Sequence, residues 1–297
     1  MRTLIIVMAI ATAPSLLPAS PARGASALPV SAAPQRSATL QLSATRIAQG
    51  GALGVTVVNA PAGGTLRIRF GGRVWPLYRT GATAATYVGT DPFTRPGSHR
   101  LVVERAAAGS ARVIAQSAVT VVRETFATRR LRLDPSKEAL FDPRLVAIER
   151  RKVGAAFSLI SPRKLWDGPF ALPTAAPRSS PYGVKSVYNG VVHGWHRGAD
   201  FAAPAGSPVR TANHGIVRLA EGIPLSGNAV LIDHGLGVFT TYMHLSSIAV
   251  RQGQRVRKGD VVGAVGSTGV ATGPHLHWGL RVHGLYADPL RWVTREP

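Results

Sequence analysis

Two histidines stand one residue apart near the end of the chain, in the stretch "GVATGPHLHWGL" at residues 269–280. In a strand, residues i and i+2 point to the same side, so the rings of His275 and His277 would enter one small volume. Such a pair either binds a metal ion or shares a proton-transfer task. The choice between these depends on what other ligands the chain offers.

Further candidate ligands lie upstream of this pair. All nine histidines except His99 fall between residues 193 and 283. The stretch "GWHRGADFAAPAGSPV" contributes His196 and Asp200, and "TTYMHLSS" contributes His244. A catalytic zinc ion usually takes three protein N or O ligands and leaves a fourth position for water. The combination therefore suits a zinc site, although each motif by itself is a weak signal.

The composition excludes some chemistry and points to an anionic neighbour. The 297 residues contain no cysteine, which excludes thiol catalysis and cysteine-ligated zinc. The formal net charge is +21, and only Arg2 and Arg23 of the basic residues lie in residues 1–27. A chain this basic is drawn to polyanions. Without a basic stripe interleaved with aromatics, an acidic cell envelope is a better partner than nucleic acid. Dispersed charge that serves only solubility is the alternative.

The first residues predict export. Residues 1–27 hold one arginine before an apolar run too short to span a bilayer, and they end in the small residues "ASA". This pattern is typical of a signal peptide cleaved after Ala27. A short membrane anchor is the alternative, which Pro14 and Pro18 disfavour. We expect the mature chain to lie outside the cytoplasm, with no stable membrane span after cleavage.

The length suits two domains, and the patterns divide the chain into five segments. We expect a signal peptide at residues 1–27, a flexible tether at 28–37, a β-sandwich at 38–122, a connector with short helices at 123–180 and a β domain that holds the candidate zinc ligands at 181–297. Alternating runs such as "TLRIRF", separated by Gly, Pro and Asn, favour an immunoglobulin-like sandwich. The last segment has short glycine-rich strands and no helical period, which favours a compact antiparallel sheet. The predicted fold class is mainly all-β.

The connector has its own signals. Asp134 followed by Pro135 is a helix-start pattern, and Pro143 should split the helical region into two short helices. The proline-rich stretch after it should be extended and lie on a neighbouring surface. Trp166 and Phe170 would anchor it there, or belong to an ordinary core.

Four motifs carry a family resemblance. The stretches "HRGADFAAPAGSPV", "YMHLS", "GQRVRKGDVVGAVGSTG" and "TGPHLHW", within residues 180–289, resemble the lysostaphin/LytM-type zinc metallo-endopeptidases in type and order. That family cleaves peptides in bacterial peptidoglycan. The resemblance implies that His196, Asp200 and His277 hold one Zn²⁺ per chain. It also implies that His244 and His275 are catalytic histidines that do not bind the metal.

The resemblance and the ligand types together imply a mechanism. Two neutral histidines and one carboxylate leave the zinc site with net charge +1, enough to lower the pKa of a bound water toward about 7. His275 would take the proton of the attacking water as general base, because imidazole titrates near neutral pH. His244 would hydrogen-bond the water or the developing oxyanion.

The other histidines of this region receive no catalytic role. We expect His234 to be structural and His193 and His214 to lie in loops or turns, and His283 lies past the last motif. His193 is the least certain, because it precedes His196 by three residues and could compete for the metal.

We therefore predict an exported zinc endopeptidase acting on peptidoglycan stem peptides or cross-links. The segment "LWDGPF" and the front domain resemble, more loosely, exported members from Gram-negative bacteria, which implies the periplasm or cell envelope and a DD-endopeptidase activity. The alternative is a non-catalytic wall-binding regulator that activates amidases, which typically lacks the metal ligands. An adhesion or scaffold protein would explain the sandwich but not the histidines.

Overall fold

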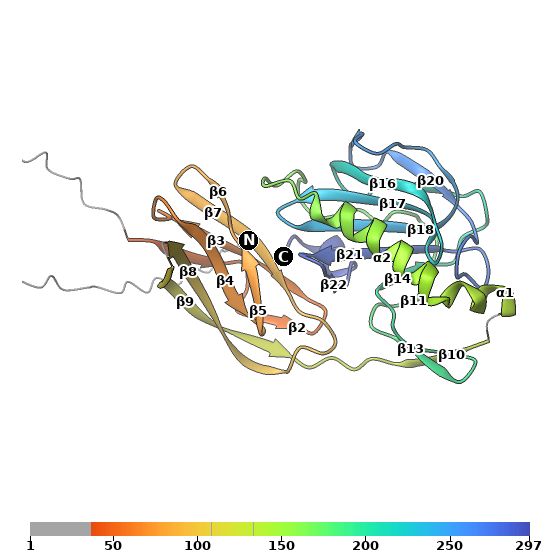
Figure 1. The fold of residues 1–297 in the computed structure, drawn as a ribbon, viewed down its shortest axis with the longest axis horizontal. Coiled ribbons are helices and arrows are strands. Elements are labelled where there is room, and N and C mark those ends of the chain that lie inside the picture. The colour runs from red at the N-terminus through yellow and green to blue at the C-terminus, as the bar shows by residue number, and fades with distance from the viewer. Residues whose placement is uncertain (1–36, 108, 133) are drawn as a thin grey trace, which may run out of the picture.

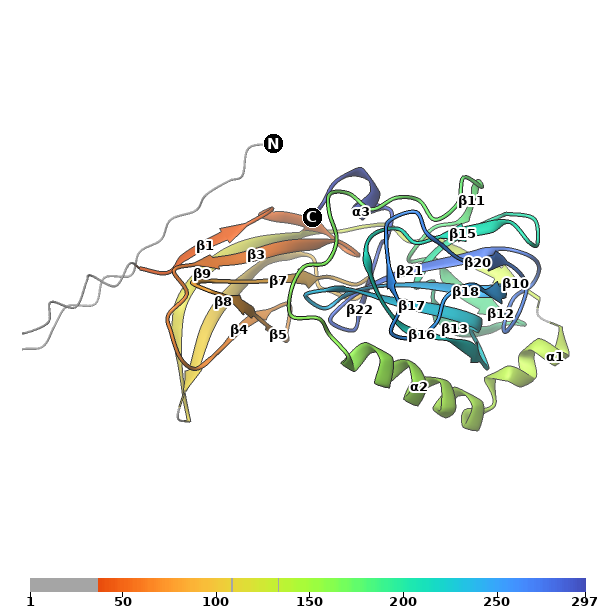
Figure 2. The ribbon, with the colours of Figure 1, turned by 90° about the horizontal axis from the view of Figure 1, so that it is seen from above.

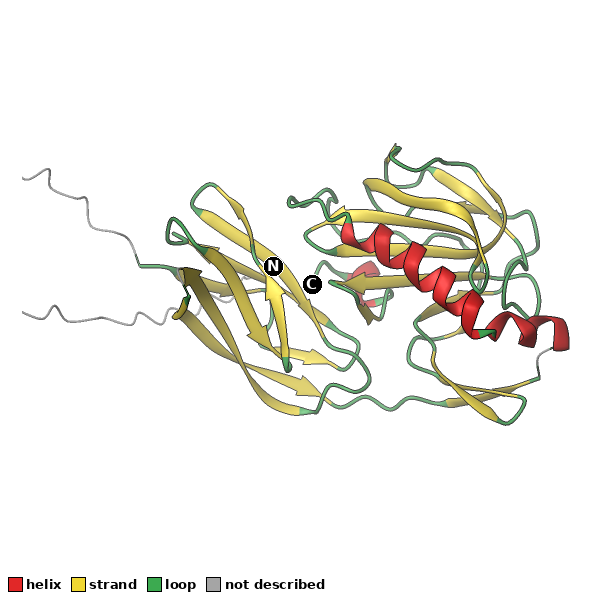
Figure 3. Ribbon diagram, viewed as in Figure 1, coloured by secondary structure: helices red, strands yellow, loops and turns green. Residues whose placement is uncertain are grey.

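The structure, a computed structural model, describes residues 37–107, 109–132 and 134–297 and leaves the side chains of Leu131 and His193 undescribed. The expected signal peptide and all but the last residue of the expected tether lie outside the described residues. The described chain is mainly β, which confirms the predicted fold class (Figure 3). Among the described residues, no helix is long and apolar enough to cross a membrane.

The first part of the chain forms two packed sheets (Figure 1). One sheet has the order β1 (Thr39–Leu42), β3 (Ala52–Val58), β7 (Thr83–Gly89), β6 (Tyr78–Thr80). The other has the order β2 (Arg46–Ala48), β9 (Ser110–Val122), β8 (Gly97–Ala107), β4 (Thr65–Phe70), β5 (Arg73–Pro76). Leu53, Val55 and Val57 of β3 are fully buried, as is Ile68 of β4, and the residues between them are more exposed. This two-residue period gives each sheet one apolar face, and the two faces form the core. That the sandwich is immunoglobulin-like stays a prediction.

The connector begins with strand β10 (Thr128–Leu131) and continues as helices α1 (Pro135–Glu138), η1 (Ala139–Phe141) and α2 (Pro143–Ser158). The side chain of Asp134 caps α1, and that of Asp142 caps α2 by accepting from the backbone N–H of Arg144 at 2.7 Å. Pro143 is therefore the first residue of a helix, where no N–H is needed. At 16 residues, α2 is longer than the short helix we expected.

Helix α2 lies along one face of the second part of the chain (Figures 1 and 2). Ala156 is buried against Leu219 and Leu231, which belong to two neighbouring strands of the large sheet. The guanidinium of Arg281 stacks over the ring of Phe157 at 3.9 Å from its centroid. These contacts fix the helix to the sheet through its second half.

The second part of the chain forms a ten-stranded sheet and a smaller three-stranded one. The main path of the large sheet runs β11 (Arg178–Ser180), β14 (Gly198–Phe201), β21 (Leu276–Val282), β18 (Val238–Ile248), β17 (Gly227–Gly235), β16 (Gly215–Ile223), β19 (Arg255–Val256). Off this path lie β15 (Pro208–Arg210), β20 (Val261–Val265) and β22 (Leu285–Ala287). The small sheet has the order β10, β12 (Lys185–Tyr188), β13 (Val191–Trp195), and the short helix α3 (Arg291–Thr294) lies near the end of the chain. All pairs in the large sheet are antiparallel, whereas β10 joins β12 in parallel.

An aromatic cluster joins the two parts of the chain. Trp166 and Phe170 are buried, and the Trp166 ring lies 5.2 Å from that of Tyr87 in the sandwich and 5.9 Å from that of Trp292 in α3. Phe170 also packs against Trp292, at 5.3 Å between ring centroids. The extended stretch after α2 is thus part of a shared core, and the two parts of the chain pack on each other.

His283 is a second element of this contact. It follows β21, yet its Nε2 lies 2.8 Å from the hydroxyl of Thr86 in the sandwich. Its ring stacks on Tyr78 at 5.8 Å and meets Trp75 edge-on at 6.0 Å. The histidine is therefore structural, and it stabilises the contact between domains.

Burial lowers the pKa of His283 to about 4, against about 6.5 for an unfolded chain. Between these values the unfolded chain binds a proton that the folded chain does not, so stability should fall as the pH drops through this window. His283→Asn removes the titrating group and tolerates the local φ of 47°. We expect it to reduce the dependence of the unfolding free energy on pH by at most about 1.4 kcal/mol per pH unit. Urea denaturation at several pH values measures this, and an unchanged slope would contradict the assignment.

Candidate active site

Three side chains meet where β14 and β21 pair. Asp200 in β14 stands directly opposite His277 in β21, and His196 lies at the turn between β13 and β14. Residues directly opposite in an antiparallel pair have Cβ atoms about 5 Å apart on the same face. The register of β14 and β21 brings Asp200 beside His277, and His196 is only four residues before Asp200 in sequence. The two motifs therefore meet at one point.

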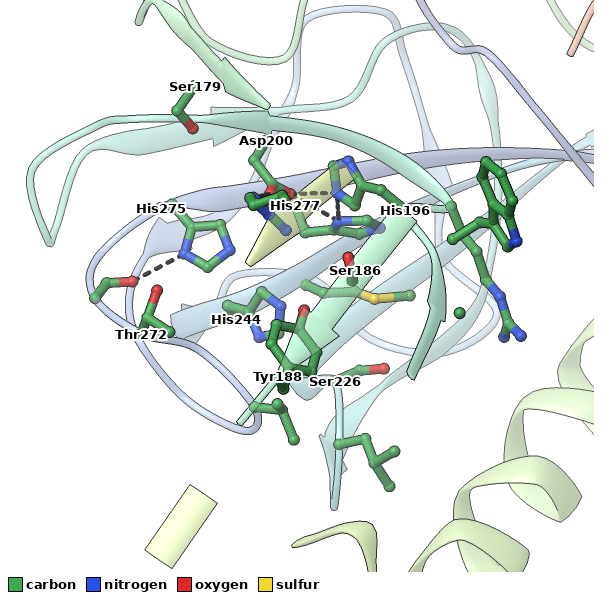
Figure 4. Close-up of a pocket in the computed structure, with 18 of the residues that line it drawn as sticks. Ser179, Ser186, Tyr188, His196, Asp200, Ser226, His244, Thr272, His275 and His277 are labelled. Carbon is green, nitrogen blue, oxygen red and sulfur yellow. Dashed lines mark hydrogen bonds and ion pairs between the residues drawn. The ribbon is translucent and has the colours of Figure 1, made fainter. Parts of the chain in front are cut away.

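The potential ligand atoms form a nearly equilateral triangle (Figure 4). His196 Nε2 lies 2.8 Å from Asp200 Oδ1 and 3.0 Å from His277 Nδ1, and the latter lies 2.9 Å from Asp200 Oδ1. Tetrahedral zinc with bonds of about 2.0–2.1 Å needs ligand atoms about 3.3 Å apart. A few tenths of an ångström of expansion would therefore accommodate the ion. Within the described chain, this is the group of side chains suited to a metal ion.

Neighbouring groups fix the orientation and charge of these ligands. Nδ1 of His196 donates to the carbonyl oxygen of Pro181 at 2.7 Å, which leaves Nε2 with its lone pair for a metal. Burial acts to raise the pKa of Asp200, but the contacts with the His196 and His277 rings favour the ionised carboxylate and outweigh burial, so this pKa lies well below its usual range. Burial lowers the pKa of His277. At neutral pH Asp200 is thus an anion and His277 is neutral, which are the protonation states of metal ligands.

His244 and His275 stand beside the triangle without joining it (Figure 4). Their rings are 4.8 Å apart, and the His244 ring lies 6.1 Å from that of His277. Nδ1 of His244 donates to the carbonyl oxygen of Thr268 at 2.9 Å, and Nδ1 of His275 donates to that of Gly273 at 2.8 Å. In both rings Nε2 is therefore the nitrogen left to act on a ligand. Burial, with the nearby histidine charges, lowers the pKa of His244 to about 3, so its ring is neutral.

A bulge in β18 aims His244 at the site. Along β17, two steps from Asn228 to Val230 correspond to three along β18, from Leu245 to Tyr242. His244 lies in this extra stretch with φ of 62°, a conformation rare for residues other than glycine. Bulges next to functional sites commonly redirect a side chain in this way.

A groove of about 540 Å³ surrounds the five residues. One wall comes from the loop between β20 and β21, and includes Thr272 and Pro274. Another comes from the connector, through the residues Arg129, Phe141, Glu149 and Val153. Sequence patterns do not predict this second wall, because its residues lie at least 40 positions before the first motif and form no pattern of their own.

The connector wall is attached on two sides of the groove. The Glu149 carboxylate accepts from the backbone N–H groups of Leu225 and Ser226 at 2.6 and 3.1 Å and from the Ser226 hydroxyl at 2.6 Å. The Lys137 ammonium donates to the carbonyl oxygen of Gly269 at 2.8 Å. The helices thus contact the loop at Leu225 and Ser226 and the loop at Gly269.

The remaining histidines lie elsewhere. His234 is fully buried, and its two ring nitrogens pair with the His214 carbonyl and the Thr240 hydroxyl, both at 2.7 Å. Burial lowers its pKa to about 4. His99 belongs to the sandwich, and the side chain of His193 is not among those described.

Residues 194–289 match the family model described as Peptidase family M23, so this part of the chain is a Peptidase family M23 domain. The match confirms the family resemblance carried by the four motifs. The His-Asp-His group gives the domain a site for one zinc ion.

The chain also matches named relatives over part of its length. The chain is 45% identical over 121 residues to the DD-carboxypeptidase/endopeptidase Mpg of Neisseria meningitidis, covering 40% of this chain and 27% of Mpg. It is 48% identical over 96 residues to the peptidoglycan DD-endopeptidase ShyA of Vibrio cholerae, covering 32% of this chain and 22% of ShyA. It thus spans about a quarter of the length of these relatives.

One solved structure resembles most of the chain. A putative peptidase M23 from Pseudomonas aeruginosa matches with a TM-score of 0.60 and 29% identity, over 83% of this chain and 94% of that one. The likeness therefore extends beyond the M23 domain into the front part of the chain.

The ligand geometry predicts how zinc content responds to substitution. The purified protein should hold about one zinc per chain, and His277→Ala should remove it by opening one corner of the triangle. His275→Ala should keep the metal, because its ring lies outside the triangle. Elemental analysis of the three proteins measures this. Full zinc in the His277 variant would show that the ligand set is wrong.

Gly198 gives a second test, through the backbone. A Cβ there would lie 2.3 Å from the carbonyl oxygen of Trp278 and 2.9 Å from Nε2 of His277. Gly198→Ala should push β14 away from β21, lower the zinc content and destabilise the fold by about 1–3 kcal/mol. Gly273→Ala is the matched control near the site, because a Cβ there meets nothing within 4 Å. Elemental analysis and thermal unfolding compare the two, and equal behaviour would contradict the expected clash.

Proposed function

We propose that this protein is a zinc-dependent endopeptidase that hydrolyses peptide cross-links of bacterial peptidoglycan. The observation that carries the proposal is the His196, Asp200 and His277 triangle, with two further histidines beside it that present free Nε2 atoms. The names of Mpg and ShyA support the substrate class and a DD-endopeptidase reaction. We place the enzyme outside the cytoplasm, where peptidoglycan lies.

In this proposal the five residues divide the work. His196, Asp200 and His277 hold the zinc, which when bound polarises the substrate carbonyl and lowers the pKa of water. His275 accepts the proton of the attacking water through Nε2, since its Nδ1 is committed to Gly273. His244 keeps a neutral ring beside His275, with its N–H committed to Thr268, and through the lone pair of Nε2 it accepts a hydrogen bond from the attacking water.

The groove supports peptide hydrolysis over a purely regulatory role. A non-catalytic wall-binding regulator has no need of a complete ligand set, whereas this chain has all three ligands and both adjoining histidines in one groove. The basic composition, with a net charge of +21, favours association with an acidic envelope polymer.

The division of roles predicts that metal binding and hydrolysis separate. His275→Ala and His244→Ala should retain zinc but lose hydrolysis by about 10²- to 10⁴-fold, the usual cost of losing an acid–base group. His99→Ala, in the sandwich, should hydrolyse at the parent rate. Zinc content and release of peptide from purified wall material measure both effects. Parent-like hydrolysis by either site variant would show that its role is assigned wrongly.

The bond is tested with two substrates. Purified cross-linked muropeptide dimers offer the D-alanyl to diaminopimelate bond, and pentaglycine offers glycyl bonds. We expect conversion of dimer to monomer and no cleavage of pentaglycine. Cleavage of pentaglycine alone would reassign the bond. Inactivity of the zinc-loaded protein on both would favour the regulator.

A further inference from the structure

Arg129 enters the groove from outside the M23 domain. It lies on β10, opposite Ser186 in the parallel pair with β12, and it lines the groove with 28% of its side chain exposed. Its position is set by the backbone of two paired strands, which gives it a defined orientation. Nothing in the roles assigned above uses it.

The guanidinium of Arg129 is poorly satisfied. Its Nη1 lies 3.5 Å from Asp200 Oδ2, at the limit of a hydrogen bond, and its buried Nε has no partner within the described chain. Arg218 shows the opposite case: its guanidinium donates to Asp233 at 2.7 and 3.1 Å and to Ser161 at 3.0 Å. A guanidinium has five N–H donors in a planar fork, so Arg129 retains most of its capacity for a ligand.

The charged side chains that line the groove leave its positive charge unbalanced. Its acidic lining residues are Asp200, which faces the metal position, and Glu149, whose two oxygens are both engaged by the loop at Leu225 and Ser226. Arg129 and Arg197 add two positive charges, and Arg197 stacks over Tyr286 instead of pairing with an acid in the groove. A carboxylate on the substrate is the group that best neutralises this surplus and fits the guanidinium fork.

We propose that Arg129 binds a free carboxylate of the peptide substrate, within one or two residues of the scissile amide. Arg129 Nη1 lies 3.5 Å from Asp200 Oδ2, so the guanidinium is close to the metal position where the scissile amide would bind. An extended peptide advances about 3.5 Å per residue, which places the bound carboxylate one or two residues from that amide. The proposal rests on the proposed function and deepens it. Arg129 would select cross-links that have a free carboxyl group over cross-links in which that carboxyl group is blocked. Arg129 is a specificity-determining residue in this account.

The test uses a matched pair of ligands on zinc-loaded full-length protein. Each is a cross-link analogue in which a methylene-amine replaces the scissile amide, one with a free carboxyl group on diaminopimelate and one with that carboxyl amidated. Calorimetry should give a dissociation constant about 10- to 100-fold lower for the free acid with the parent protein, the range of a charged hydrogen-bonded pair. Because nothing is cleaved, this measurement does not depend on turnover.

Three variants decide between recognition and support of the metal site. Arg129→Ala should abolish the preference for the free acid while keeping zinc, and Arg129→Lys should restore only part of it, because lysine lacks the fork. Arg130→Ala is the control, since it removes the same charge from the exposed neighbouring position of β10. No preference in the parent, or an undiminished preference in Arg129→Ala, would overturn the proposal. Loss of zinc in Arg129→Ala would also overturn it and make Arg129 a positioning residue for Asp200.

Hydrolysis of the cleavable pair separates the two proposals. If the parent binds the free acid preferentially but cleaves neither dimer, the proposed function fails and the carboxylate site stands. If the parent cleaves both dimers equally and binds both analogues equally, the function stands and the role of Arg129 is wrong.

Discussion

The pairing of β14 with β21 is the constraint on which the site depends. It sets Asp200 opposite His277, and a shift of one residue would turn one of the two to the other face of the sheet. His196 completes the triangle only because the turn after β13 returns the chain to the same edge, with Gly198 allowing the strands to approach. The carboxylate and the two imidazoles place three potential ligand atoms within 3.0 Å of one another, an arrangement that is prepared for a cation.

Around this centre, the structure assigns different work to histidines that look alike in sequence. His196, His244 and His275 each commit Nδ1 to a backbone carbonyl, so the Nε2 atom of each is left to face a metal or a substrate. His234 commits both nitrogens within the core and has none left for chemistry. The hydrogen-bond partner of each ring thus separates functional from structural histidines.

The groove depends on residues of the connector as well as on the M23 domain. Helix α2 and strand β10 supply a wall, and the Glu149 and Lys137 contacts attach the connector to the loop at Leu225 and Ser226 and to the loop at Gly269. The aromatic cluster of Tyr87, Trp166 and Trp292 joins the sandwich to the same body. Removal of the residues before the M23 domain would therefore take away part of the groove as well as a neighbouring domain.

The sequence alone determined the family and the mainly β fold, and it predicted the His-Asp-His group, because these depend on residue types and spacings within short motifs. The "HLHW" and "HRGAD" stretches can be identified from the sequence without knowledge of the contacts around them. Only the tertiary structure decided that Arg129 and Glu149 border the groove, that α2 is a long helix packed across the sheet, and that His283 belongs to the contact between domains. These features arise from contacts between residues far apart in sequence, for which no local pattern exists. The bulge that turns His244 toward the site is of the same kind, because it is defined by how β18 pairs with β17.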